Sequence, residues 1–336
     1  MITASPSQGA PADSLYLGID LGGTKVLALV GTSDGQTLGE GLVVTPADEG
    51  AERVVAAMLH AAEQAVAAAL VDIGTLAGVG IASAGAIDYN HGSVIHSPHL
   101  SGWDHVPLVS MLRRHLNVPI VIDNDANLAA LGEHRYGAGR GVSNLLYMTV
   151  STGIGGGMIL SGELYRGATG FAGEVGHISV LAGGPYGKSR TAGALEALAA
   201  GTALVWEVRR RLEQGEPSSL QALASSPNAD AITAETVFEA FHQGDALAMQ
   251  VVAQGVQYLG AGLTSLVNVL SPEVLIIGGG LSNQWEAYIQ PAVEIMRQQT
   301  FVGMGRDLRV VPPELGANAG ALGAIALASD AASRGP

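Results

Sequence analysis

The feature of this chain that most constrains its fold is a strand–glycine turn–strand unit that occurs twice, once in each half. The first unit has apolar strands at 15–19 and 26–30, joined by the turn DLGGTK. The second has strands at 144–150 and 157–160, joined by the polar turn STGIGG. Because a repeated supersecondary unit indicates internal duplication, the sequence predicts a duplicated α/β architecture of two lobes with a cleft between them.

The first turn has the composition of a phosphate-binding loop. Gly22 and Gly23 allow the backbone to approach an anion and to turn N–H groups toward it. Thr24 can donate a hydroxyl hydrogen bond, and Lys25 supplies a point charge. Asp20, at the strand end, could hold Mg²⁺ through water. An ordinary hairpin turn is the alternative, although such turns rarely need Asp, Thr and Lys together.

Two further glycine runs are candidate nucleotide contacts. Thr152 and Gly153 lie in the second turn, which could hold phosphate by the same reasoning. Gly279 and Gly280 follow a short apolar strand and would fit beside an adenine and ribose. Neither run is strong evidence alone, because 47 of the 336 residues are glycine, twice the usual share of roughly 7%. The second run also lacks the GxGxxG spacing of a dinucleotide fold, which disfavours an oxidoreductase.

A second acidic turn, Asp123-Asn124-Asp125, lies between an apolar strand and a helix. Asn and Asp are preferred helix N-caps, so capping is the structural interpretation. One of the three residues suffices for a cap, and the others are then in excess. A carboxylate within reach of a hydroxyl is a competent general base, typically worth about 10²–10⁴-fold in rate.

Glu174, His177 and Glu196 form a looser group. Each alone is as well explained as a solvated charge, or as a structural histidine. Together they match the hydrogen-bonding set that sugar hydroxyls need, in which charged acceptors bind the hydroxyl donors.

Composition narrows the class of protein. The chain has no cysteine, which excludes disulfides and thiolate metal sites, and it carries 16 Lys+Arg against 30 Asp+Glu. Without a dense basic patch, nucleic acid is not an expected partner. The apolar runs are too short to cross a bilayer, and the first residues, MITASPSQGAPADS, lack the pattern of a secretion signal. We therefore expect a cytoplasmic protein with no membrane partner.

Taken in order, these stretches resemble the ROK family (repressor, open reading frame, kinase), whose kinases act on sugars. DLGGTK and STGIGGG are similar to the family's two phosphate motifs, and IIGGG to its adenosine-side motif. NDAN resembles the catalytic segment, and AGEVGH with Glu196 the sugar-binding segment. The resemblance covers 16–327 and implies the actin-like ATPase fold, a ribonuclease H-like duplicated α/β fold. It predicts a disordered tail at 1–14, a small lobe at 15–123 plus 316–330, and a large lobe at 124–315.

The resemblance also implies roles. Asp125 would deprotonate the 6-hydroxyl of a hexose for in-line attack on the γ-phosphate of ATP, and Asp20 would position Mg²⁺ through water. The implied sugar-binding residues are Asn124, Glu174, His177, Glu196, His99 and Gly85. The implied phosphate- and nucleotide-binding residues are Asp20, Gly22, Gly23, Thr24, Lys25, Thr152, Gly153, Gly279 and Gly280. Glucose is the first expectation for the substrate, and a homodimer for the assembly.

Two positions depart from the family pattern. The family commonly carries a zinc motif, CxCGxxGCxE, and the aligned stretch here is GKSRTAGALE, with Gly187, Ser189 and Ala194 in place of the cysteines. Since zinc needs about four N, O or S ligands, no structural zinc is expected, and His177 must be oriented by another group such as a backbone carbonyl or Glu196. In SPHLSGW, which resembles the family's PNLxGW, His99 replaces an asparagine.

Other functions stay open at this point. Family repressors carry a helix-turn-helix domain before the first phosphate motif, and the 14 residues before Leu15 are too few for one. A non-catalytic sugar sensor is a second hypothesis, although it predicts loss of the base or of the phosphate turns. Fructose, mannose and N-acetylated hexosamines are alternative substrates, and polyphosphate is an alternative phosphoryl donor.

Overall fold

The fold is described from a computed structural model of the chain, which covers residues 14–187, 190–224 and 231–334. Residues 1–13 of the predicted tail, and Ser189 of the zinc-like stretch, lie outside the described residues. The chain divides into two compact units: unit 1 comprises 1–143, 157–173 and 313–336, and unit 2 comprises 144–156 and 174–312. These contact-based boundaries differ from the predicted lobes, which remain a prediction.

Unit 1 contains a five-stranded sheet in the order β3-β2-β1-β4-β8. The first three strands form an antiparallel meander, and β4 and β8 continue the sheet in parallel with β1. The central strands are almost entirely buried, as their apolar sequences predict. Their bounds are β1 Leu15–Leu21, β2 Lys25–Thr32, β3 Thr37–Val44, β4 Gly78–Ser83 and β8 Ile120–Asn124.

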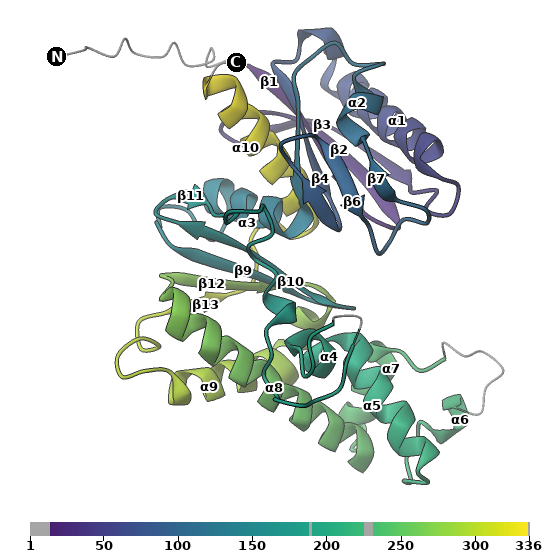
Figure 1. Cartoon of the computed structure of the whole chain (residues 1–336), viewed down its shortest axis with the longest axis vertical. Helices are drawn as coiled ribbons and strands as arrows, with labels where there is room; N and C mark the ends of the chain where they lie inside the picture. The colour runs from purple at the N-terminus through teal and green to yellow at the C-terminus, as the bar shows by residue number, and fades with distance from the viewer. Residues whose placement is uncertain (1–13, 188–189, 225–230, 335–336) are drawn as a thin grey trace. The chain divides into compact units, whose positions relative to one another are not determined.

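Helices cover both faces of this sheet (Figure 1). Helix α1 packs on β2 and β3, whereas α10 packs on β1 and β4 and also against α3. Strand glycines allow this close packing: a Cβ at Gly41 would lie 2.0 Å from the Ala61 carbonyl oxygen of α1, and one at Gly80 would lie 1.9 Å from the Ala324 carbonyl oxygen of α10. The bounds are α1 Ala51–Ala69, α3 Asp125–Tyr136 and α10 Ala319–Arg334.

A small antiparallel sheet, β5-β6-β7, was not predicted from the sequence. It occupies the loop between β4 and α2, and its strands are only three or four residues long, too short for a recognisable alternation of apolar and polar residues. The helix α2 that follows this sheet spans only five residues. The bounds are η1 Ile73–Thr75, β5 Ala86–Asp88, β6 Ser93–His96, β7 Asp104–Val106 and α2 Leu108–Leu112.

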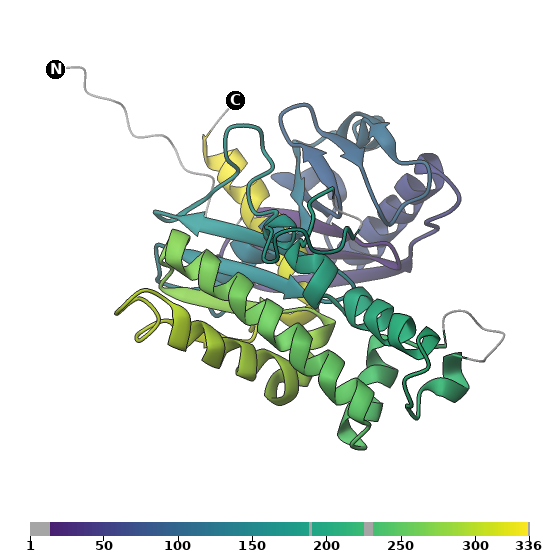
Figure 2. The ribbon, with the colours of Figure 1, turned by 60° about the horizontal axis from the view of Figure 1, so that its bottom comes forward.

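The second sheet has the order β11-β10-β9-β12-β13. Strand β12 runs parallel to both of its neighbours, and β11 is antiparallel to β10. In unit 2, α8 and α9 pack against each other and run side by side along the strands (Figure 2). The strand bounds are β9 Leu145–Val150, β10 Ile154–Leu160, β11 Glu163–Leu164, β12 Val274–Gly278 and β13 Arg309–Val311.

The segment 195–213 forms two helices, α4 and α5, rather than one continuous helix. The chain breaks at Ala200 because the next amide, of Gly201, donates to the Ser151 carbonyl (2.8 Å) instead of continuing the helix. The helical elements of unit 2 are η2 Val175–His177, α4 Leu195–Ala199, α5 Gly201–Glu213, α6 Gln221–Ala224, α7 Ala234–His242, α8 Ala246–Leu270, η3 Gly280–Gln284, η4 Trp285–Ile289 and α9 Gln290–Gln299. The short η5 Gly316–Asn318 precedes α10 in unit 1.

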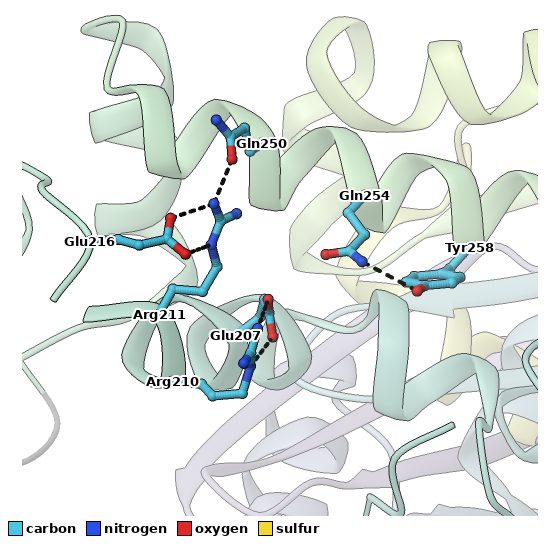
Figure 3. Close-up of polar contacts among 7 residues, drawn as sticks. All are labelled: Glu207, Arg210, Arg211, Glu216, Gln250, Gln254 and Tyr258. Atoms are coloured by element: carbon cyan, nitrogen blue, oxygen red, sulfur yellow. Dashed lines mark hydrogen bonds and ion pairs between the residues drawn. The ribbon is translucent and has the colours of Figure 1, made fainter. Parts of the chain in front are cut away.

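Polar contacts join α5 to its neighbours (Figure 3). Arg211 forms an ion pair with Glu216 and also donates to the Gln250 side chain of α8. The preceding residue, Arg210, pairs with Glu207 one turn earlier on the same helix. The contact between Arg211 and Gln250 connects α5 to α8 at the end distant from the break at Ala200. Among the residues that the structure covers, no helix combines the length and apolarity needed to cross a membrane.

Candidate active site

The first predicted phosphate turn lies between β1 and β2 in unit 1, and its backbone is held from both sides. The Gly22 amide donates to the Lys25 carbonyl (3.1 Å), and Thr45 Oγ1 donates to the Gly22 carbonyl (2.8 Å). The Thr45 amide donates to the Thr24 carbonyl (2.9 Å). The side chains of Thr24 and Lys25 are exposed, so a hydroxyl and an ammonium group remain available for an anion. Thr45 was not predicted, since nothing in the sequence marks it.

His99 packs against this turn. A Cβ at Gly23 would lie 2.8 Å from the Cβ of His99, so only glycine fits there without displacing the histidine segment. His99 also lies close enough to Asp125 that its positive form lowers the pKa of that carboxyl group. The structure therefore places His99 against the glycine turn and within electrostatic reach of the predicted base.

Asp20 is the penultimate residue of β1 and faces the start of α10, where a Cβ at Gly320 would lie 2.5 Å from its Oδ2. The pKa of Asp20 is raised to about 7, chiefly by burial and then by the negative charge of Asp125, whereas Lys25 acts in the lowering direction. Two nearby carboxyl groups in a buried setting suit a divalent cation, because its charge would remove both the burial cost and the repulsion. Asp20 thus fits the predicted role at Mg²⁺.

Asn124 performs the capping of α3. Its Oδ1 accepts from the Ala126 amide (2.9 Å) and the Asn127 amide (3.2 Å), and its Nδ2 donates to the Gly85 carbonyl (3.0 Å). Gly85 has φ of +113°, and a Cβ there would lie 2.2 Å from the His96 carbonyl oxygen. Glycine is therefore required at 85 both by conformation and by space.

Because Asn124 caps α3, the side chain of Asp125, the first residue of this helix, is not needed as the cap. Burial is the main cause that raises the pKa of Asp125, while the Ala126 amide and His99 act in the opposite direction. A general base is most effective when its pKa lies near the working pH, so a raised pKa suits this role at neutral pH.

Asp123 is held differently. Its carboxylate forms an ion pair with Arg166, whose Nε lies 2.5 Å from Oδ2. Arg166 was not predicted as a site residue.

The second phosphate turn lies in unit 2, between β9 and β10. The Ser151 amide donates to the Gly153 carbonyl (2.8 Å), and Thr202 Oγ1 of α5 donates to the Thr152 carbonyl (2.8 Å). The Thr152 side chain is exposed. As in unit 1, the backbone of the turn is held by its neighbours and a hydroxyl is left for a ligand.

The predicted sugar-binding residues of unit 2 lie around the start of β10. Glu196 Oε2 accepts from the Ile154 amide (2.9 Å), and a Cβ at Gly153 would lie 2.5 Å from the same oxygen. A Cβ at Gly176 would lie 2.1 Å from the Ile154 carbonyl oxygen, so the segment of Glu174 and His177 meets Ile154 from its other side.

His177 is not held by Glu196 through any contact that the structure records. Its Nε2 lies 3.5 Å from Glu174 Oε2, and the two side chains are 43% and 52% exposed. Exposure of this size leaves both groups able to exchange their mutual contact for hydroxyl groups of a ligand.

Unit 2 also contains a cavity of about 450 Å³, within the range of small-molecule sites. It opens beside Ser151 and Thr152 of the phosphate turn and beside Gly280, and its far walls come from α5 and the start of α7. Gly279 has φ of +87°, and a Cβ there would lie 2.6 Å from the Val150 carbonyl oxygen. The remaining lining residues are Gly201, Thr202, Val205, Trp206, Arg209, Ile232, Thr233, Ala234, Glu235 and Leu281. Sequence reasoning missed the wall residues because they come from separate helices.

The two sheets and their glycine turns define the class of protein to which the chain belongs. Two sheets, each opening with a strand–glycine turn–strand unit, form the actin-like ATPase fold, as predicted from the sequence. The family model described as "ROK family" matches residues 16–331. The chain belongs to the ROK family, as its motifs predicted.

Its relatives include both enzymes and regulators. The glucokinase of Halalkalibacterium halodurans is 32% identical over 316 residues, covering 93% of this chain and 94% of that protein. The xylose repressor of Caldicellulosiruptor bescii is 31% identical over 311 residues, covering 93% of this chain and 77% of that protein. The structure of a ROK family glucokinase from Streptomyces griseus in complex with glucose and AMPPNP has a TM-score of 0.76 and 34% identity, covering 95% of this chain and 100% of that one.

Proposed function

We propose that this protein is an ATP-dependent hexose kinase that phosphorylates the 6-hydroxyl group, with glucose as the preferred substrate. The observation that carries the proposal is that the three polar residues at the start of α3 make different contacts. Asn124 caps the helix and Asp123 is paired with Arg166, so that Asp125 alone is left for chemistry, within the same unit as the DLGGTK turn.

In the proposed reaction, Asp125 accepts the proton of the sugar's 6-hydroxyl group. The hydroxyl oxygen forms a bond to the γ-phosphorus of ATP while the bond from that phosphorus to the β,γ-bridging oxygen breaks, and ADP leaves. Most of the rate enhancement in such a transfer comes from positioning and from stabilisation of the phosphoryl charge. The raised pKa of Asp125 supports its role as the proton acceptor.

The nucleotide would be bound through its phosphates and its base. Thr24, Lys25 and Thr152 are the proposed phosphate contacts, and Gly22, Gly23 and Gly153 would let the backbone approach the phosphates. The cavity beside Gly280 has the volume and the mixed lining that an adenosine needs. The complex of the Streptomyces griseus relative with AMPPNP supports ATP as the donor. Mg²⁺, held at Asp20 through water, would neutralise charge on the phosphates.

We propose that the sugar hydroxyls are hydrogen-bonded by the residues that the family pattern implies. Asn124, Gly85 and His99 belong to unit 1, and Glu174, His177 and Glu196 to unit 2. One carboxylate oxygen of Glu196, Oε2, accepts a hydrogen bond from the Ile154 amide, and this contact fixes the direction in which Oε1 points. Such orientation by a neighbouring group is what makes hydroxyl recognition selective.

A non-catalytic sugar sensor is the second candidate, because a xylose repressor is among the relatives at 31% identity. The two functions differ in one observable: a sensor binds sugar without forming ADP. The presence of Asp125, Asp20, Lys25 and Thr152 favours the enzyme.

A substrate panel tests the proposal. We expect kcat/KM to be highest for glucose with Mg-ATP, and lower for fructose, mannose, N-acetylglucosamine and N-acetylmannosamine. Replacing ATP by polyphosphate tests the donor. Sugar binding seen by calorimetry without ADP formation would favour the sensor, and a higher kcat/KM for another hexose would reassign the substrate. Light scattering checks the homodimer that the family resemblance implies.

A further inference from the structure

We propose that Arg166 is a positioning residue: through Asp123 it holds the start of α3 so that Asp125 is placed for proton transfer. The inference rests on the proposed function, in which Asp125 is the base. It is carried by a chain of contacts confined to unit 1. Arg166 itself comes from the loop after β11 and contacts none of the reacting groups in the proposed mechanism.

Asp123 is the centre of this network. Its side chain is only 3% exposed, and both carboxylate oxygens are used. Oδ1 accepts from the Asn124 amide (2.7 Å) and from Asn127 Nδ2 (2.9 Å), while Oδ2 receives Arg166 Nε (2.5 Å). The carboxylate therefore holds the residues immediately before and two positions after Asp125.

Arg166 is itself held rigidly. Its guanidinium carbon lies 5.0 Å from the centroid of the Tyr89 ring, and its carbonyl accepts from the Ala172 amide (3.1 Å), which closes the loop 166–172. Gly170, with φ of +89°, brings this loop against the same ring, since a Cβ there would lie 2.9 Å from Tyr89 Cε1. The side chain of Arg166 is 21% exposed. A clamped arginine of this kind is specific in geometry as well as in charge.

The network also reaches the sugar-binding residues of unit 1. Tyr89 directly follows β5, and the residue before that strand, Gly85, accepts the hydrogen bond from Asn124. Arg166 thus connects the α3 start with the segment after β5. A buried carboxylate that loses its cation either takes up a proton or moves toward water. In both cases its hydrogen bonds to Asn124 and Asn127 weaken, and Asp125 shifts with them.

Loss of Arg166 should affect kcat and leave nucleotide binding nearly unchanged. Proton transfer requires hydrogen-bond reach between base and hydroxyl, so a small displacement of Asp125 lowers kcat. The DLGGTK turn is held by Thr45 and by its own backbone contacts, not by Arg166. Binding of the nucleotide should therefore change little.

The test uses Arg166→Gln in the full chain, with Arg135→Gln as the matched control. Arg135 lies at the other end of α3 and pairs with Asp330 of α10 (2.7 Å), so its loss removes an ion pair from the same helix without touching its start. We expect Arg166→Gln to lower kcat by about 10- to 100-fold with KM for ATP within about twofold, and Arg135→Gln to retain kcat. Amide exchange of the 120–130 region should quicken in Arg166→Gln alone.

A double variant separates positioning from charge balance. Asp123→Asn with Arg166→Gln removes both charges, so the melting temperature should return toward that of the unaltered protein while kcat stays low. Recovery of kcat in the double variant overturns the inference, as does a kcat in Arg166→Gln within about twofold of the original below its melting temperature. Should Arg166→Gln not fold, Arg166→Lys carries the test with an expected loss of about tenfold, since lysine cannot reproduce the planar fork.

Asp125→Asn, assayed in parallel, tests the proposed base separately from the positioning role of Arg166. Full activity in Asp125→Asn refutes the proposed base and with it the proposed function. Loss of activity there, together with unchanged kcat and unchanged amide exchange in Arg166→Gln, refutes only the role of Arg166.

Discussion

Asp20 and Asp125, at the ends of two strands of one sheet, lie close enough that the charge of Asp125 adds to the raised pKa of Asp20. Asp20 is the penultimate residue of β1, and Asp125 follows β8, which is separated from β1 in the sheet only by β4. Two carboxyl groups with separated roles, one beside a metal and one for a proton, are a common arrangement for phosphoryl transfer. Four of the predictions below concern these two residues or the groups that act on them.

Replacing the proposed base should remove turnover and leave binding. We expect Asp125→Asn to lower kcat by at least about 100-fold while the Kd for sugar, measured by calorimetry, changes by less than about threefold. Asp104→Asn, whose side chain is 80% exposed in the same unit, is the control and should retain full activity. Retained turnover in Asp125→Asn would mean that another group is the base.

The acid limb of the pH–rate profile should report the environment of Asp125. The base acts only when ionised, so the rate falls as pH falls through its raised pKa, above the ordinary value of about 3.9. His99 lowers the pKa of Asp125, so His99→Asn should move the acid limb of kcat to higher pH. His105→Asn, an exposed histidine of the same unit, should leave it in place. An unchanged limb in His99→Asn would contradict the electrostatic contact.

Removing the Asp20 charge should stabilise the free protein while abolishing activity. The folded pKa of Asp20 is about 7, against about 3.9 when unfolded, so ionisation costs folding stability progressively as pH rises from about 4 and fully above 7. We expect Asp20→Asn to melt higher than the original protein at pH 8 in EDTA, by several degrees, and the gain to shrink toward pH 5. A gain that is independent of pH would contradict the assignment.

Metal removal tests the expected cofactors separately. EDTA should abolish phosphorylation, and added Mg²⁺ should restore it, because the phosphate charge is otherwise not neutralised. A zinc-selective chelator should leave the melting temperature unchanged, since the zinc motif's cysteines are replaced. Melting at a lower temperature under that chelator would reveal a structural zinc.

Glu133 should be important for stability. Its side chain is fully buried on α3, and its carboxylate accepts from the amides of Ala138 (2.9 Å), Glu314 (3.1 Å) and Leu315 (2.8 Å). Glu133→Gln directs an NH₂ group toward those donors, and we expect it to cost about 2–4 kcal/mol of unfolding free energy. Denaturant unfolding measures this, with exposed Glu163→Gln as a control that should change it by less than about 0.5 kcal/mol. An equal loss in both variants would argue against the buried role.

Some elements of the fold could be predicted from the sequence and others could not. The two strand–turn–strand units, the α3 start and the duplicated α/β architecture followed from local patterns, because glycine turns and apolar strands are encoded within a few residues. The actin-like fold followed from the family resemblance of those motifs. The β5-β6-β7 sheet and the break at Ala200 did not. Short strands leave no periodic signal, and Gly201 leaves the helical pattern because of a hydrogen bond to Ser151, 50 positions earlier.

For the site, the sequence by itself determined which residue types are available: the two phosphate turns, the acidic turn and the family to which they belong. Only the tertiary structure decided how the three polar residues at 123–125 divide their tasks. The residue types at 123–125 do not specify which residue caps the helix and which joins an ion pair. Arg166, 43 positions away, decides this by pairing with Asp123. Hydrogen bonds and ion pairs depend on distance in space, which the order of residues along the chain does not specify.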